Sequence, residues 1–395
     1  MLTFLFKIMH MKNFFFVLIF LSAIIISCGN KSNNETRYNL SKSKSITIPI
    51  DNETVNKTFC YQFITLNDTD YYITIDWKTN SINIYDFKAK KLFRKIKLFK
   101  EGPSQNLGIQ ANGFVVKNFD TILIVSMTPM NVYMINIEGD LLKKIDYSRI
   151  YNGREILMSN PSGNNIPILN NDCVYFTNML NFFKYNFRFN QQAIAGSRFV
   201  CKVNIVNDSC TLMDLTFPKE FVNRNLQGIR VLRTIGMGKD YVYKFSYGDE
   251  IFVTSDNVNY KTYTIVPDSK HEFPDLSPKY FYDFLKGVEE HLTHNEYKRL
   301  IFDQFNDVFY LIIQEPITVD NKTDLKTCSM YPLASVIILD KDFKFIGRKP
   351  LENLRYDIMT SFVTEDGLYI SEDHPENPDF NEDEMHFRLF KLEKK

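Results

Sequence analysis

Cys28 stands where a short apolar run ends near the N-terminus, in a setting where its thiol can be acylated. The run covers residues 14–26 and is followed by Ser27, Cys28 and Gly29. A run of about 13 residues suits the apolar part of a signal peptide, and a membrane-spanning helix needs roughly 20. Branched apolar residues, a small residue and then cysteine form the pattern of the bacterial lipobox, whose cysteine forms a thioether to diacylglycerol. We therefore predict signal cleavage between Ser27 and Cys28 and lipid attachment at Cys28.

The lipid would make the membrane the first partner of this protein. Two or more acyl chains hold a protein stably on a bilayer, whereas one chain holds it only marginally. Residues 29–44 are rich in Asn, Ser and Lys, which predicts a flexible tether. We expect residues 1–27 to be a signal peptide, 28–44 a lipidated tether and 45–395 the folded domain. The location is then the cell envelope, at the outer membrane, and the lack of acidic residues directly after Cys28 favours its periplasmic over its surface side.

Two histidines are spaced so that a helix would place them on one side. His291 and His294 follow Glu289 and Glu290, and imidazoles three residues apart on a helix can share one metal ion. No third ligand is identifiable nearby. The favoured interpretation is therefore an exposed helix end with solvated side chains, and no metal ligand is assigned.

An acidic stretch near the C-terminus has the oxygen ligands that calcium prefers. It comprises Glu372, Asp373 and residues 379–384, with His374 between its two parts. Its spacing does not match an EF-hand loop, so a solvated acidic loop is the favoured interpretation and calcium the alternative.

Other short motifs give no catalytic or cofactor assignment. Residues 236–239 (GMGK) look like the end of a phosphate-binding loop, but Arg233 and Asp240 stand where that loop needs glycine and a hydroxyl residue. We predict a turn there. No Gly-x-Ser-x-Gly segment occurs. Residues 120–122 (DTI) fit a short pattern for O-glycosylation, which we keep as an alternative to an unmodified turn. We predict no catalytic residue, no metal ligand and no cofactor.

Charge and cysteine content narrow the class of protein. Removing residues 1–27 removes two of 47 basic residues and none of 47 acidic ones, so the net charge of the remaining chain is 45 − 47 = −2. This balance argues against nucleic acid as a partner. Five cysteines follow Cys28, and none has the close spacing of a zinc or redox motif. A two-residue turn at Asn207-Asp208 would pair Cys201 with Asp214 and Cys210 with Ile205, too far apart for a disulfide.

The elements that must position any site are strands. Runs of β-branched and aromatic residues alternate with turn formers along the chain, and several are apolar on both faces, which suits stacked sheets. They fall into six groups. The groups cover residues 71–98, 113–147, 173–214, 241–266, 300–348 and 359–392.

Six groups of three or four strands predict an all-β fold, a six-bladed β-propeller. The last group has three clear strands, and residues 45–50 (SITIPI) form an unassigned strand at the front. We predict that this strand joins the last blade and closes the ring. The alternative is two β-sandwich domains, disfavoured because no long linker divides the chain. One inserted helix is predicted, with Ser277 as its N-cap, Pro278 at its first position and apolar residues at helical spacing as far as Leu292.

The order of four segments resembles the six-bladed β-propeller lipoproteins of unknown function from Bacteroidota. The segments are the lipobox at Cys28, residues 100–104 (KEGPS), residues 119–122 (FDTI) and residues 297–310. The resemblance implies a propeller fold and an envelope location, and it implies no activity.

We therefore expect a non-enzymatic scaffold that binds a ligand, an envelope protein or a glycan at the propeller mouth. The alternative is an envelope enzyme acting on glycans or peptides. Two carboxylates with raised pKa facing one mouth would favour the enzyme.

Overall fold

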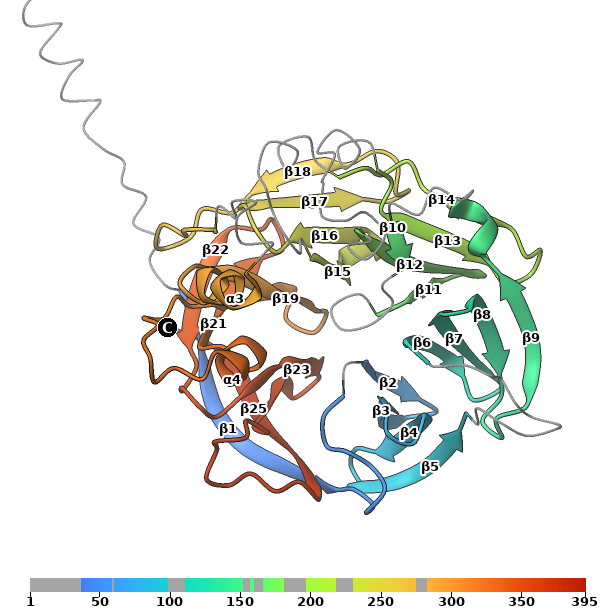
Figure 1. Ribbon diagram of the computed structural model, residues 1–395, viewed down its shortest axis with the longest axis horizontal. Helices are drawn as coiled ribbons and strands as arrows, with labels where there is room; N and C mark the ends of the chain where they lie inside the picture. Colours follow the sequence, from blue (N-terminus) through green and yellow to red (C-terminus); the bar gives the residue numbers. More distant parts are fainter. Residues whose placement is uncertain are drawn as a thin grey trace, which may run out of the picture. The chain divides into compact units, whose positions relative to one another are not determined.

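The strands form six antiparallel sheets, arranged as blades around a common centre (Figure 1). They belong to the unit Thr36–Lys395. The predicted all-β, six-bladed propeller is confirmed, and the two-sandwich alternative is wrong. The computed structural model describes residues 37–58, 60–98, 111–151, 157–159, 166–180, 197–217, 230–274 and 283–395.

Blades 1 to 3 follow one another along the chain. Blade 1 consists of β2 (Tyr61–Leu66), β3 (Thr69–Asp76), β4 (Ser81–Asp86) and β5 (Lys91–Lys97). Blade 2 consists of β6 (Gly113–Asn118), β7 (Thr121–Met127), β8 (Met130–Ile135) and β9 (Leu141–Asp146), after which a short 3-10 helix, η1, covers Ser148–Tyr151. Blade 3 consists of β10 (Leu157–Ser159), β11 (Ile168–Asn170), β12 (Cys173–Leu180), β13 (Val200–Asn204) and β14 (Cys210–Leu212).

Blades 4 to 6 complete the ring and carry the helices. Blade 4 consists of β15 (Val231–Ile235), β16 (Tyr241–Phe245), β17 (Glu250–Thr254) and β18 (Lys261–Thr264), with the 3-10 helix η4 (Met237–Lys239) after β15. Blade 5 consists of β19 (Glu296–Asp303), β20 (Val308–Gln314), β21 (Ala334–Asp340) and β22 (Phe345–Pro350). Blade 6 consists of β23 (Asp357–Thr364), β24 (Gly367–Ser371), β25 (Glu384–Lys394) and β1 (Tyr38–Pro49). Helix α3 (Phe284–Leu292) precedes β19, and α4 (Leu325–Met330) joins β20 to β21.

The first strand closes the ring, as predicted. β1 pairs antiparallel with β25, from Tyr38 opposite Lys394 to Pro49 opposite Glu384, and it is the outermost strand of blade 6 (Figure 1). The strand begins at Tyr38, seven residues before the expected Ser45. The predicted boundary between tether and domain at residue 44 is therefore wrong. The polar side chains of residues 39–44 are compatible with an outer strand, because alternate residues of such a strand face solvent.

Burial falls from the inner to the outer strands of a blade. All seven residues of β20 are buried, whereas β18 has three exposed residues and one of intermediate exposure. Inner strands have a neighbouring blade on both faces, and this explains their continuous apolar runs. The core consequently lies between blades. The seam between blades 6 and 1 is mainly aromatic and includes Tyr61, Tyr72, Tyr85, Phe87, Phe362, Tyr369 and Phe387.

The predicted hairpin at Asn207-Asp208 has a different register. Cys210 lies opposite Val203 and Cys201 opposite Leu212. The loop is longer because the Asn204 side chain accepts hydrogen bonds from the backbone of residues 206 and 207, an arrangement that favours an early turn. The conclusion about disulfides still holds within the part of the chain that the structure describes, where no disulfide joins any of the five cysteines after Cys28.

The inserted helix also differs from its prediction. α3 begins at Phe284, and the Asp283 carboxylate caps it by accepting from the Lys286 backbone N–H at 3.1 Å. Ser277 and Pro278 lie outside the described residues. Leu292, the last residue of the predicted apolar series, is buried. α4 was not expected. Among the residues described, no helix is long and apolar enough to cross a membrane.

Candidate functional site

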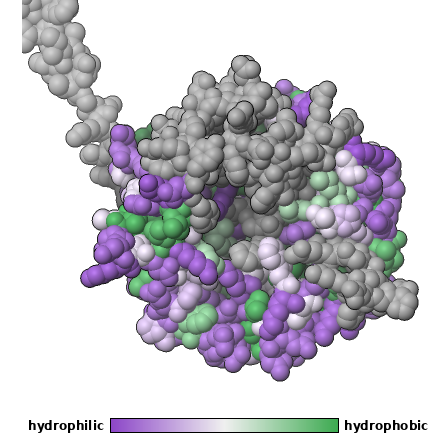
Figure 2. All heavy atoms as spheres, viewed as in Figure 1, coloured by the Kyte–Doolittle hydropathy of each residue, from purple (hydrophilic) through white to green (hydrophobic). Residues whose placement is uncertain are grey.

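The two ends of the blades carry different connections. In an antiparallel four-stranded blade, the turns between the first and second strands and between the third and fourth lie at one end, here called the turn face. The other end carries the remaining connections, including α3 and α4, and is here called the helix face (Figure 1). Viewed from the same side as Figure 1, the described surface is largely hydrophilic with separate apolar patches (Figure 2).

The two histidines of the metal alternative lie on the helix face, and each has a protein partner. His291 Nδ1 lies 2.8 Å from the Tyr247 hydroxyl, and His294 Nδ1 lies 2.8 Å from the Glu290 carbonyl oxygen. The imidazoles are only 28 % and 26 % exposed. The expectation of a solvated helix end is therefore wrong, because α3 packs these rings against its own last turn and the neighbouring blade.

Basic side chains of the protein bind two carboxylates of the acidic stretch. Glu372 accepts from Arg355 at 2.6 Å and from Arg388 at 3.1 Å. The Asp373 carboxylate lies 2.9 Å from His386 Nδ1. These two carboxylates are buried, so the expectation of a solvated loop is wrong for them. The described residues contain no group of three or more side chains arranged to hold a metal ion.

The remaining motifs lie at turns. Residues 236–239 join β15 to β16, where the Gly236 backbone N–H donates to the Asp240 carbonyl oxygen at 2.8 Å. The turn predicted for this segment is confirmed. Asp120 is exposed at the turn before β7, while Thr121 is half-buried. Cys28 and residues 100–104 lie outside the described residues.

Two carboxylates with raised pKa do lie together on the helix face of blade 6. Burial raises the pKa of Asp357 to about 6, against the opposing effect of the Lys57 ammonium. Burial also raises the pKa of Asp373, against the hydrogen bonds from His386. They are only 5 % and 8 % exposed, respectively. Their raised pKa values meet one part of the condition set for an enzyme, but the side chains are almost closed to solvent.

A lysine–tyrosine pair lies near these carboxylates. Lys57 Nζ donates to the Tyr331 hydroxyl at 2.9 Å, and the Tyr331 ring lies 5.0 Å from that of His374. Burial, with the charges of Asp357 and Asp373, raises the pKa of Tyr331 to about 12. The phenol therefore stays protonated at neutral pH and is not poised to act as a base.

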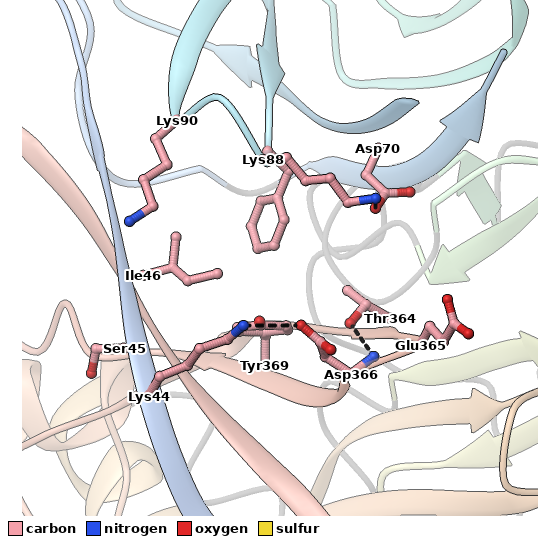
Figure 3. A pocket seen from close by; sticks show the side chains of 11 residues that line it. Lys44, Ser45, Ile46, Asp70, Lys88, Lys90, Thr364, Glu365, Asp366 and Tyr369 are labelled. Atoms are coloured by element: carbon pink, nitrogen blue, oxygen red, sulfur yellow. Dashed lines mark hydrogen bonds and ion pairs between the residues drawn. The ribbon is translucent and has the colours of Figure 1, made fainter. Parts of the chain in front are cut away.

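The open site is a cleft at the turn face, between blades 6 and 1. Its volume is about 350 Å³, near the lower end of the roughly 300–1,000 Å³ usual for ligand pockets. Figure 3 shows side chains from both blades around it. The lining residues are Lys44, Ser45, Ile46, Asp70, Phe87, Lys88, Lys90, Thr364, Glu365, Asp366 and Tyr369.

Local backbone features set the directions of the charged side chains in this cleft. The register of β1 against β25 shifts between Lys42 and Ser45. This shift is a β-bulge, and it includes Lys44. Bulges change the direction of side chains and are frequent beside functional sites. Lys90 has φ +55° in the turn between β4 and β5. Gly367 has φ +136°, and a Cβ there would collide with the Phe390 carbonyl oxygen. The turn that presents residues 364–366 therefore requires glycine.

The cleft walls contain three ammonium groups and three carboxylates. Lys44 Nζ lies 3.2 Å from Asp366, and Lys88 Nζ lies 3.4 Å from Asp70 (Figure 3). These ion pairs are partly solvated, and such pairs contribute only about 0–1 kcal/mol each. A ligand can therefore rearrange them at low cost.

The Tyr369 side chain packs beside the cleft and is closed to solvent, with no exposed surface. Burial, together with the charge of Asp366 and a hydrogen bond to it, raises the pKa of Tyr369, so the phenol stays protonated at neutral pH. The groups that a ligand in the cleft can reach are therefore the exposed charged side chains.

No sequence pattern indicated this cleft. Its residues come from four segments that meet only when β1 closes the ring, and Lys44 had been placed in the tether. The one local signal is the sequence of residues 365–367 (EDG), whose residue types indicate a turn and no binding site.

Comparison with known proteins places the chain in a family. Residues 37–350 match the family described as "Domain of unknown function (DUF4221)". A crystal structure of a member of that family from Bacteroides vulgatus is 18 % identical, with 91 % of this chain and 100 % of that chain covered and a TM-score of 0.79. A Bacteroides fragilis protein, named as a candidate exported protein, is 9 % identical, with 92 % and 98 % covered and a TM-score of 0.51. No curated protein sequence matches the chain.

At these identities the two structures support the propeller fold alone. The family match agrees with the resemblance noted from the sequence, namely to six-bladed propellers of unknown function from Bacteroidota. Because the match spans residues 37–350, far more than half of the sequence, the protein belongs to the DUF4221 family.

Proposed function

We propose that this protein is a lipid-anchored lipoprotein of the cell envelope whose propeller binds a ligand without transforming it. The leader supports the anchor, since an apolar run of signal-peptide length ends directly before Ser27 and Cys28. The similar Bacteroides fragilis protein named as a candidate exported protein agrees with export. The expected attachment is at the outer membrane.

One observation carries the binding role: the cleft between blades 6 and 1 is open and is lined by charged side chains whose ion pairs are partly solvated. Such pairs contribute little to stability, so a ligand can replace them with its own polar groups at low cost.

A second candidate, an envelope enzyme, is favoured by the two carboxylates on the helix face. Asp357 has a pKa of about 6, within the range useful for general acid–base catalysis. We rank this candidate second, because a general acid must reach its substrate and this carboxylate is 5 % exposed.

Fractionation of cells producing the wild type or Cys28→Ser tests the anchor. The wild type should incorporate radiolabelled palmitate and remain with the membrane, and the variant should do neither. Equal labelling and fractionation of the two proteins would contradict lipidation.

Pull-down of the native, lipidated protein from envelope extracts tests the binding role. A specifically retained compound or protein supports it, provided that Lys44→Gln, a change at an exposed side chain of the cleft, reduces retention. Turnover of a glycan or peptide panel that is lost in Asp357→Asn, with nothing retained, would support the enzyme instead.

A further inference from the structure

We propose that the outer edge of blades 6 and 1 rests on the membrane surface and binds the anionic headgroups of phospholipids. This inference goes beyond the ligand cleft, and it rests on the lipid anchor of the proposed function. It follows from the length of the tether, the distribution of basic residues over the outermost strands and an exposed aromatic ring on one of these strands.

The tether keeps blade 6 close to the bilayer. Nine residues, 28–36, precede Arg37, and such a stretch spans at most about 30 Å when fully extended. The strand that follows, β1, has 12 residues and is therefore about 40 Å long. Because the tether is shorter than this strand, the outer edge of blade 6 remains near the lipid headgroups. A weak attraction is effective there, since the anchor makes the contact intramolecular.

Basic residues are concentrated on this part of the perimeter. β1 and β5 are the outermost strands of blades 6 and 1 and lie next to each other (Figure 1). They contain six basic residues and no acidic one, whereas the other four outermost strands, β9, β14, β18 and β22, together contain five basic residues and one acidic residue. The six are Lys42, Lys44, Lys91, Arg94, Lys95 and Lys97.

Most of these basic groups can reach a headgroup. All except Lys95 are exposed, as is Lys90 in the turn before β5. Carboxylates of the protein pair with Lys42, Lys44 and Lys97, but these pairs are partly solvated and contribute little to stability. A lipid phosphate can therefore replace the carboxylate at low cost. Each basic residue close to an anionic leaflet adds to the attraction.

An aromatic ring lies among the basic groups of β5. Phe93 is 48 % exposed, and its ring packs on that of Phe119, with 5.6 Å between the centroids. Exposed aromatic residues beside basic ones are typical of surfaces that lie in the headgroup region. Lysines on an outer strand also protect the edge from pairing with another chain. That role does not depend on the charge of a nearby membrane, so the two roles can be separated.

Amine labelling of the lipidated protein on vesicles tests the contact. The protein, purified in detergent, is inserted through its anchor into vesicles of phosphatidylcholine, either alone or with about one-third phosphatidylglycerol. A water-soluble reagent acetylates exposed lysines, and mass spectrometry measures the rate at each site. On the anionic vesicles Lys42 and Lys90 should react at least about threefold more slowly than on the neutral ones. Lys261, exposed on β18 of blade 4, should react equally on both. The protection should disappear in 1 M salt, where the Debye length is about 3 Å.

Two double variants test the contribution of charge. Lys91→Gln/Lys97→Gln removes two exposed charges from β5 and should reduce the protection of Lys42 and Lys90 by at least about half. Lys144→Gln/Lys261→Gln, the matched control, removes two exposed charges from β9 and β18 and should leave this protection unchanged.

Equal labelling of Lys42 and Lys90 on the two kinds of vesicle, with the protein retained on both, would overturn this inference and leave the lipid anchor intact. Protection of Lys261 to the same extent would also overturn it, because the contact would then not be confined to blades 6 and 1. If the protein remains on neither kind of vesicle, the anchor of the proposed function fails and this inference fails with it.

Discussion

Replacing the Asp357 carboxylate with an amide should make the protein more stable at neutral pH. Asp357 is buried at the first position of β23, and its carboxylate accepts from the Met359 backbone N–H at 3.0 Å. An asparagine keeps the oxygen that accepts this bond. Asp357→Asn therefore removes the buried charge while leaving the local geometry largely in place.

The expected gain follows from the pKa of this carboxyl. Burial raises it from an ordinary 3.8 to about 6. The difference of about 2.2, at ~1.36 kcal/mol for each pH unit, makes ionisation within the fold cost about 3 kcal/mol. The folded state holds its proton more tightly than the unfolded state. The free energy of unfolding should therefore fall as the pH rises from about 4 to about 6, and stay lower above that.

Urea unfolding of wild type and Asp357→Asn between pH 4 and pH 8 measures this effect. At pH 4 the two proteins should have equal free energies of unfolding, and at pH 7.5 the variant should be more stable by up to about 3 kcal/mol. Asp256→Asn is a control of opposite sign. Backbone N–H groups of Val258 and Asn259 lower the pKa of Asp256 to about 2, so its variant should be less stable at pH 7.5.

A variant less stable than wild type at pH 7.5, or a difference that does not change with pH, would refute the reasoning about Asp357. A confirmed gain would mean that the fold retains a carboxylate that lowers its stability. Functional groups commonly impose such a cost, so this result would strengthen the enzymatic alternative.

Two further predictions concern ring closure and a buried lysine. Leu40→Ala removes a fully buried side chain from β1 and should lower the free energy of unfolding by about 2–5 kcal/mol. The control Leu142→Ala, at a half-exposed position on the outer strand β9, should change this free energy by less than about 0.5 kcal/mol. Equal losses of the two variants in urea titrations would contradict the closing role of β1. Burial lowers the pKa of Lys244 from 10.5 to about 7, so the wild type should gain stability as the pH rises from about 7 to 10, because only the unfolded lysine stays protonated there. Lys244→Met should lack this gain, and a slope unchanged in thermal or urea unfolding would show that another group causes it.

Several structural features were predictable because they depend on short stretches of sequence. Strands such as β20 and β7 are rich in β-branched and aromatic residues, and such short runs favour strands. The closing role of β1 followed from counting, because the last group lacked one strand and an unassigned strand preceded the first. The helix near Leu292 showed helical spacing, although its true cap, Asp283, lies closer to it than the predicted one.

The site residues were predicted poorly because their partners are distant in sequence. Glu372 looked like part of a solvated acidic loop, yet it binds Arg355, Arg388 and, from the other end of the chain, Ser45. The hairpin at residues 204–209 was misplaced because a single side chain, Asn204, decides where its turn begins.

The sequence by itself determined the all-β class, the number of blades, the closure by the N-terminal strand and the leader pattern at Cys28. These features depend on residue type and on spacing along the chain. Only the tertiary structure decided which charges are neutralised, which carboxyls have raised pKa and where a cleft opens. These properties depend on burial and on distances between blades: a carboxylate such as Asp357 has an ordinary pKa until neighbouring strands exclude water from it.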